Sequence, residues 1–131
     1  MIVVDTHIII WHALQPELLT QKSVDAIDNA NKEDGIIFCR ISLWEIAMLM
    51  KKQRLQVEIG YQAFIKLVFQ SNRYVYRELS PEIAELSTQL PPSVNKDPAD
   101  RIIAATSIFE NVPLVTAAKN LRTTTSISTI W

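Results

Sequence analysis

The stretch Ile2-Val-Val-Asp-Thr-His-Ile-Ile-Ile-Trp-His-Ala-Leu14 starts with a β-branched run, passes through an acid and ends in an apolar segment. β-branched residues favour a strand, and the segment after Asp5 follows with little room for a turn. Gln15-Pro16 then ends that segment, because the residue before a proline avoids the helical conformation. The stretch therefore predicts a strand over 2–4, an acid at its end and a helix over 8–14.

The same unit recurs along the chain. A turn at Asp34-Gly35 precedes a buried strand over 36–39, and Ser42-Leu-Trp-Glu45 matches a capping box that starts a helix reaching about Lys51. Further strands are predicted over 74–79, 113–116 and 126–131, and further helices over 20–31, 61–70, from Pro81 to before Pro91, over 97–110 and as one turn over 117–121. Strands that alternate with helices predict βαβ units, and hence an α/β fold with a small, mainly parallel sheet.

Length and composition indicate a single domain over 1–131. Hydrophobic residues make up 48% of the chain and charged residues 21%, which is typical of globular domains. The net charge of -1 provides no overall basic field, so a nucleic-acid partner would have to be held by a local patch or a metal ion.

The N-terminus has no basic region or cleavage site, and Asp5 interrupts its apolar run far short of a membrane span. Cys39 is the lone cysteine, cannot form an internal disulfide and fits a reducing compartment. We therefore expect a cytoplasmic protein without a membrane segment.

Two more acids start the helix in the stretch Asn95-Lys-Asp-Pro-Ala-Asp-Arg-Ile-Ile-Ala-Ala-Thr-Ser107. Asp97 before Pro98 has the pattern of an N-cap with proline in the first helical position, and Asp100 lies within the first turn. Both acids can be explained by helix capping and by the helix dipole alone.

The positions of the other acids favour a metal site. Asp5 follows the first strand, Glu45 lies at the start of the helix after the second, and Asp97 and Asp100 start the helix before the fourth. In α/β folds such positions meet outside the carboxyl ends of the strands. Two carboxylates 4 Å apart repel by roughly 4 kcal/mol at an effective dielectric near 20, so a cluster needs protons or a cation. Oxygen ligands without His or Cys suit Mg²⁺ or Mn²⁺, which can support phosphodiester hydrolysis.

Four motifs together resemble the PIN-domain ribonucleases, in particular the VapC-type toxins of toxin–antitoxin pairs. They are Met1-Ile-Val-Val-Asp-Thr-His7, Ser42-Leu-Trp-Glu-Ile-Ala47, Asp97-Pro-Ala-Asp-Arg-Ile-Ile-Ala-Ala105 and Pro113-Leu-Val-Thr-Ala-Ala-Lys119. The resemblance covers essentially the whole chain. It implies a three-layer α/β/α domain, an acidic site for Mg²⁺ or Mn²⁺, an RNA substrate and a VapB-like antitoxin as partner.

The resemblance also implies roles for individual residues. Asp5, Glu45 and Asp100 fall on the family's metal-site acids, Asp97 on an additional acid, and Thr116 on a polar residue beside the site, with Thr6 and Ser42 as supporting residues. Ala118 stands where the family usually has a further aspartate. Its presence removes one negative ligand, so we expect weaker metal binding and reduced activity. The alternative is a catalytically silent PIN-like domain that acts by binding another protein.

Partner surfaces and substrate contacts are less sharply marked. The motifs place Arg101 and Lys119 beside the acids, so we expect both to contact the substrate, unless Arg101 pairs with the carboxylates instead. The apolar segments around Trp11 and Trp44 carry more large side chains than one sheet face needs, which predicts a homodimer interface or an antitoxin groove.

Two other function classes fit poorly. Gly35 and Gly60 are the only glycines, so no phosphate-cradling nucleotide loop can be built. A phosphotransferase that uses Asp5 as nucleophile would usually carry a second aspartate where His7 stands.

Overall fold

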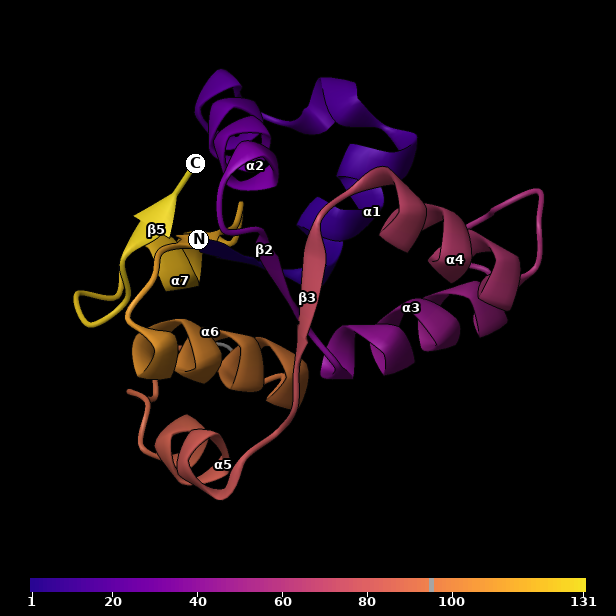
Figure 1. The fold of residues 1–131 in the computed structure, drawn as a ribbon. Coiled ribbons are helices and arrows are strands. Elements are labelled where there is room, and N and C mark those ends of the chain that lie inside the picture. The colour runs from indigo at the N-terminus through magenta and orange to yellow at the C-terminus, as the bar shows by residue number, and fades with distance from the viewer. Residues whose placement is uncertain (95) are drawn as a thin grey trace.

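The computed structural model describes residues 1–94 and 96–131, in which five parallel strands form one sheet between layers of helices (Figure 1). Asn95, the first residue of the stretch quoted above for its acids, lies outside the described residues. The strands are β1 (Ile2–Val4), β2 (Ile36–Cys39), β3 (Tyr74–Arg77), β4 (Leu114–Val115) and β5 (Thr129–Ile130). Their order is β3-β2-β1-β4-β5, which places β1 at the centre. The predicted α/β fold with a parallel sheet is confirmed.

The helices follow the predicted alternation with strands. They are α1 (Thr6–Leu14), the short 3-10 helix η1 (Pro16–Leu18), α2 (Gln21–Lys32), α3 (Ile41–Lys51), α4 (Tyr61–Ser71), α5 (Pro81–Thr88), α6 (Pro98–Glu110) and α7 (Lys119–Arg122). None of these helices is both long and apolar enough to cross a bilayer.

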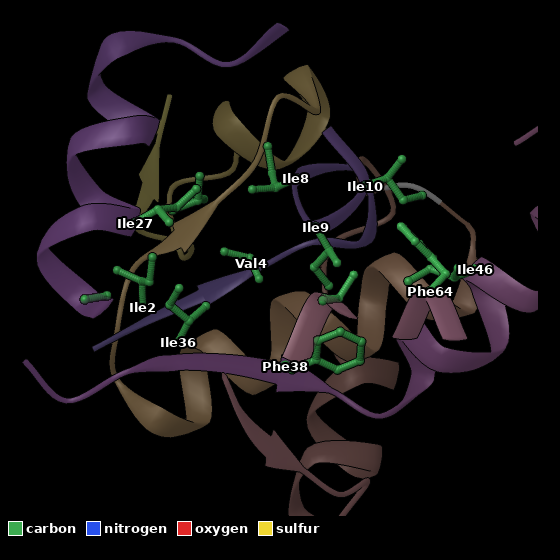
Figure 2. Close-up of a cluster of buried hydrophobic side chains, with 13 residues drawn as sticks. Ile2, Val4, Ile8, Ile9, Ile10, Ile27, Ile36, Phe38, Ile46 and Phe64 are labelled. Carbon is green, nitrogen blue, oxygen red and sulfur yellow. The ribbon is translucent and has the colours of Figure 1, made fainter. Parts of the chain in front are cut away.

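The two faces of the sheet support separate cores. Val4, Ile36 and Phe38 point to one face, where they pack against side chains of α1, α2, α3 and α4 (Figure 2). Val3 and Ile37 point to the other face and pack against α6, with α5 outside it (Figure 1). Successive residues of one strand thus serve opposite cores, as the alternation of side chains along a strand requires. The three-layer α/β/α architecture is thereby confirmed.

Local capping signals fix several helix starts. The Ser80 side chain accepts the N–H of Ile83 at 3.1 Å, and Asn111 ends α6 in the left-handed conformation at φ 54°. The capping box predicted for Ser42 is wrong, because α3 begins at Ile41 and its N-cap is Arg40, which makes no side-chain cap. Ser42 lies instead inside the first turn of α3 and is fully buried.

Candidate metal centre

Three of the four predicted acids come together at the carboxyl edge of the sheet. Glu45, Asp97 and Asp100 each offer a carboxylate oxygen, and these oxygens lie within 4.8 Å of one another. Glu45 is buried, Asp100 half-buried and Asp97 exposed, so the cluster is closed on the side of α3 and open to solvent at the start of α6. An open side is what a substrate or a hydrated ion needs.

The first turn of α6 presents two of these acids together. Asp97 is the N-cap of α6, and its Oδ1 accepts the N–H of Ala99 at 3.0 Å, with Pro98 as the first helical residue. Asp100 lies three residues further along the chain, in the first turn of α6, and is half-buried. Capping and membership of the cluster are therefore compatible at Asp97, because the carboxylate has two oxygens with several lone pairs.

Asp5 lies beside this group without belonging to it. It is 6% exposed and caps α1, with Oδ1 accepting the N–H of Ile8 at 3.0 Å. Burial raises the pKa of Asp5, although hydrogen bonds from Thr116 and from the Ile8 N–H act in the opposite direction. Asp5 is not among the three acids whose oxygens lie within 4.8 Å of one another, and its role as a metal ligand stays a prediction.

Glu45 is the buried member of the cluster, and its ionisation is disfavoured. Burial raises the pKa of Glu45, and the negative charges of Asp97 and Asp5 raise it further. The hydrogen bond from Thr6 and the charge of His7 partly offset this. The charge of Asp5 therefore acts on the cluster, although its carboxylate does not belong to it.

A buried chain of hydroxyls holds Glu45 in place. Thr6 Oγ1 donates a hydrogen bond to Glu45 Oε1, and Ser42 Oγ lies 2.8 Å from Thr6 Oγ1. Thr6 has a single hydroxyl proton, so Ser42 must be the donor in its contact with Thr6. Both hydroxyl side chains are buried. The two predicted supporting residues therefore orient Glu45 from α1 and from α3.

Thr116 connects Asp5 with the residue that departs from the family pattern. It is fully buried after β4, hydrogen-bonds the Asp5 side chain and accepts the N–H of Ala118 at 3.0 Å through Oγ1. Ala118 is the N-cap residue of α7 and supplies no side-chain cap. A carboxylate at position 118 would thus start a helix, as Asp5 and Asp97 do, at the carboxyl edge of the sheet.

The two predicted basic contacts differ in their surroundings. The Arg101 guanidinium donates to the backbone carbonyls of Ser87 at 3.1 Å, Leu90 at 2.8 Å and Val94 at 3.4 Å. It therefore binds the loop between α5 and α6, while the substrate contact or carboxylate pair expected from the sequence stays a prediction. Lys119 is exposed in the first turn of α7, where a substrate can reach it.

Sequence reasoning gave no role to His7, which the structure places at the mouth of the site. His7 is exposed in the first turn of α1, and its ring centroid lies 5.9 Å from that of Trp11. Its charge lowers the pKa of both Asp5 and Glu45. In the sequence, the feature that could have indicated a role for His7 is its position two residues after Asp5, the acid that follows β1.

The chemistry of the donor set fits a hard divalent cation. All three clustered ligands are carboxylates, which suit Mg²⁺ or Mn²⁺, and neighbouring oxygens on one such ion lie about 3 to 4 Å apart. The oxygens of Glu45, Asp97 and Asp100 lie within 4.8 Å of one another, which is close to that range.

Two surfaces away from the carboxylates carry exposed apolar side chains. The first, which we term the α1–α4 groove, has a volume of about 270 Å³ and is lined by His12, Ala13, Leu14, Val57, Ile59, Phe64, Leu67, Val68, Ser71 and Asn72. The second, which we term the Trp44 face, surrounds a cavity of about 260 Å³ lined by Cys39, Arg40, Ile41, Trp44, Arg77, Glu78, Leu79, Ile102 and Thr106. Trp11 belongs to neither surface, since it packs against Trp131 with ring centroids 6.1 Å apart.

A family model and a named relative match most of this sequence. The family model described as "PIN domain" matches residues 2–125. Ribonuclease VapC22 of Mycobacterium tuberculosis (strain ATCC 25618 / H37Rv) is 31% identical over 121 residues, which cover 92% of this chain and 89% of that protein.

Solved structures share the fold at lower sequence identity. VapBC2 from Rickettsia felis, solved bound to a DNA fragment from its promoter, contains a chain that superposes with a TM-score of 0.72 at 18% identity, covering 98% of this chain and 97% of that one. A toxin–antitoxin complex from Klebsiella pneumoniae gives a TM-score of 0.65 at 18% identity, covering 97% and 95%. From the family model and the M. tuberculosis relative it follows that this chain belongs to the PIN-domain family.

Proposed function

We propose that residues 1–131 act as one PIN-like domain, a divalent-metal-dependent endoribonuclease that is the toxin of a toxin–antitoxin pair. The observation that carries the proposal is the group of Glu45, Asp97 and Asp100, whose oxygens lie within 4.8 Å of one another around a buried glutamate. The ribonuclease name of the M. tuberculosis relative supports it. RNA in the cytoplasm is the corresponding substrate.

The metal ion, the clustered acids and Thr6 would each have a separate role in RNA cleavage. Mg²⁺ or Mn²⁺ bound at the cluster would supply a Lewis acid for the phosphodiester and would lower the pKa of a bound water. Glu45, Asp97 and Asp100 hold the ion, and Thr6 keeps the Glu45 carboxylate oriented toward it. Asp5 adds negative charge behind the cluster without coordinating in this arrangement.

Two further residues, Thr116 and Lys119, would interact with the substrate. Thr116 orients Asp5 and lies beside the site, where its hydroxyl helps to position water or a phosphate oxygen. Lys119 is exposed at the start of α7 and can contact a phosphate of the RNA strand. These contacts do not require a large basic surface, which agrees with the net charge of -1.

Ala118 makes reduced activity part of the proposal. A further acid at this N-cap position would add one negative ligand beside Asp5, and its absence weakens the hold on the ion. The same residue supports the second candidate function, in which the domain is catalytically silent and acts only through protein binding.

Cleavage assays on the chain and on Ala118→Asp separate the two candidates. With Mg²⁺ or Mn²⁺ and a mixture of cellular RNAs, we expect slow cleavage by the chain, faster cleavage by Ala118→Asp and none by Glu45→Gln. If neither the chain nor Ala118→Asp cleaves any RNA, and neither binds Mn²⁺ in calorimetry, the silent-domain function replaces the nuclease.

We further propose that the antitoxin covers the α1–α4 groove. The groove is apolar, Leu67 is 52% exposed beside it, and the His12 Nδ1 atom is buried without a partner among the described residues. An amphipathic helix would bury the leucine side chains and offer His12 a hydrogen bond. The structural relative from Klebsiella pneumoniae is a toxin–antitoxin complex, which supports an antitoxin as the occupant of this groove.

We assign the predicted homodimer interface to the Trp44 face. Trp44 is 58% exposed and Leu79 54%, and both line one cavity, so a second copy would remove a large apolar area from water. Light scattering should give a dimer for the chain and a monomer for Trp44→Glu. Leu67→Glu is the matched control, because it should leave the dimer intact and weaken binding of the proposed antitoxin. A dimer that survives Trp44→Glu would refute this assignment.

A further inference from the structure

The loop between α5 and α6 determines where the first turn of α6 lies, and two of its carbonyls accept hydrogen bonds from a side chain outside the loop. Pro91 and Pro92 have no N–H group, and the described part of the loop forms a turn bond from the Val94 N–H to the Pro91 carbonyl at 3.0 Å. Leu90 and Val94 are buried in the core beneath α6, so their carbonyls need donors from the protein. The donors come from Arg101.

Arg101 joins three parts of this region. Its side chain donates to the carbonyls of Leu90 and Val94 in the loop, and to the carbonyl of Ser87 in the last turn of α5. Helix ends leave such carbonyls without intrahelical partners, and a cation there is also favoured by the helix dipole. The Arg101 backbone N–H donates to the Asp97 carbonyl at 3.2 Å. One residue therefore ties α5, the loop and the N-cap of α6 together.

These hydrogen bonds of Arg101 influence the acidic cluster through the position of Asp97. Asp97 is the exposed residue at which the loop enters α6, and its charge is repelled by Glu45 and Asp100 within the cluster. Movement of the loop outward would relieve the repulsion and separate the three carboxylates. An arginine that fixes the loop on both sides of Pro91 and Pro92 opposes that movement.

We propose that Arg101 is a positioning residue for the metal centre, which holds Asp97 and Asp100 within coordinating distance of Glu45 by fixing the α5–α6 loop. The inference rests on the proposed metal site. It assigns Arg101 a function that does not involve contact with the RNA.

The sign of the effect on metal affinity distinguishes positioning from simple electrostatics. Arg101 is a positive charge next to Asp100, so removing it should strengthen cation binding if charge alone mattered. We expect the opposite for Arg101→Gln, a loss of about 10- to 100-fold in Mn²⁺ affinity, which is typical when a group that orients metal ligands is removed. Arg101→Lys should also bind Mn²⁺ more weakly, because an ammonium keeps the charge without the planar fork that reaches three carbonyls.

The experiment uses calorimetric titration of the whole chain with Mn²⁺ alone, together with hydrogen exchange over 89–97 in the metal-free state. Arg54→Gln removes an exposed arginine elsewhere, and Ile127→Val removes a buried methylene from the same core as Leu90. Both controls should keep wild-type Mn²⁺ affinity, and the Arg101 variants should show faster loop exchange as well as weaker binding. Unchanged Mn²⁺ affinity in Arg101→Gln overturns the inference alone. A wild-type chain that binds no Mn²⁺ refutes the proposed metal site and the inference with it.

Discussion

Replacing Glu45 by glutamine should make the metal-free chain more stable while removing its ability to hold the ion. Gln keeps the size of the side chain and an oxygen that accepts the Thr6 hydrogen bond, but it carries no charge. The substitution therefore removes the repulsion between the buried carboxylate and its two neighbours on α6. Proteins commonly give up stability at functional sites in this way.

The separation of the carboxylates sets the size of the effect. Two unit charges at the 4.8 Å limit of the cluster repel by about 3.5 kcal/mol at an effective dielectric of 20, and by about 0.9 kcal/mol in bulk water. Asp97 is exposed and lies near the lower figure, whereas the half-buried Asp100 lies between the two. After allowance for imperfect accommodation of the amide, we expect Glu45→Gln to raise the free energy of unfolding by about 1–3 kcal/mol in EDTA.

Urea unfolding followed by tryptophan fluorescence measures this difference. Glu58→Gln, which alters an exposed glutamate in the loop between α3 and α4, is the matched control and should change stability by less than about 0.5 kcal/mol. At a Mn²⁺ concentration about 100 times the dissociation constant, the wild-type chain gains about 2.7 kcal/mol and the Gln variant gains nothing. A Gln variant less stable than wild type in EDTA would refute the reasoning, because ionised Glu45 would then contribute more through its contacts than it costs through repulsion.

Three further predictions concern the same region and its surroundings. Ala118→Asp should strengthen Mn²⁺ binding in calorimetry, and in excess metal it should also raise thermal stability, because it supplies both a ligand and the cap that α7 lacks. The metal-free chain should become more stable as the pH falls from 7 toward 4: burial raises the folded-state pKa of Asp5 and of Glu45, so the folded state binds protons in that window before the unfolded state does. The double variant Asp5→Asn with Glu45→Gln should lose most of this dependence in urea titrations at several pH values. Cys39 should react slowly with thiol reagents under native conditions, since burial raises its pKa to about 11, and fast labelling would show that the core around β2 opens.

Local patterns predicted the parts of the fold that depend on neighbours in the sequence. Ser80 and Asp97 precede prolines, and both proved to be N-caps because the cap bond spans only two or three residues. The start of α3 was mispredicted, since Arg40 already has helical backbone angles and the chain passes from β2 into the helix without a capping side chain. Ser42 and Glu45 matched a local pattern, but their actual partner is Thr6, which lies 36 and 39 residues away.

In the candidate site, too, features set by neighbours in the sequence were predictable, whereas contacts between distant segments were not. The acids were predictable because strand ends and helix starts meet at one edge of a parallel sheet. The role of Arg101 was not, since its neighbours in sequence are acids whereas its hydrogen-bond partners are carbonyls supplied by another segment. Trp11 and Trp44 looked equivalent as tryptophans in apolar helices. The C-terminal Trp131 covers one of them, and Trp44 remains exposed.

The acids at this edge differ in how far the fold itself stabilises their charge. Asp97 is exposed and is the N-cap of α6, so the Ala99 N–H and the helix dipole support its carboxylate even without an ion, whereas burial raises the pKa of Asp5 in spite of its own cap on α1. Glu45 lies within α3, is buried, and has Thr6 as its hydrogen-bond donor. Its negative charge therefore depends on an external cation more than that of Asp97 does. It follows that proton release and the stability of this chain are coupled through the buried Asp5 and Glu45, that Glu45 adds metal binding to this coupling, and that Asp97 serves as a preformed ligand.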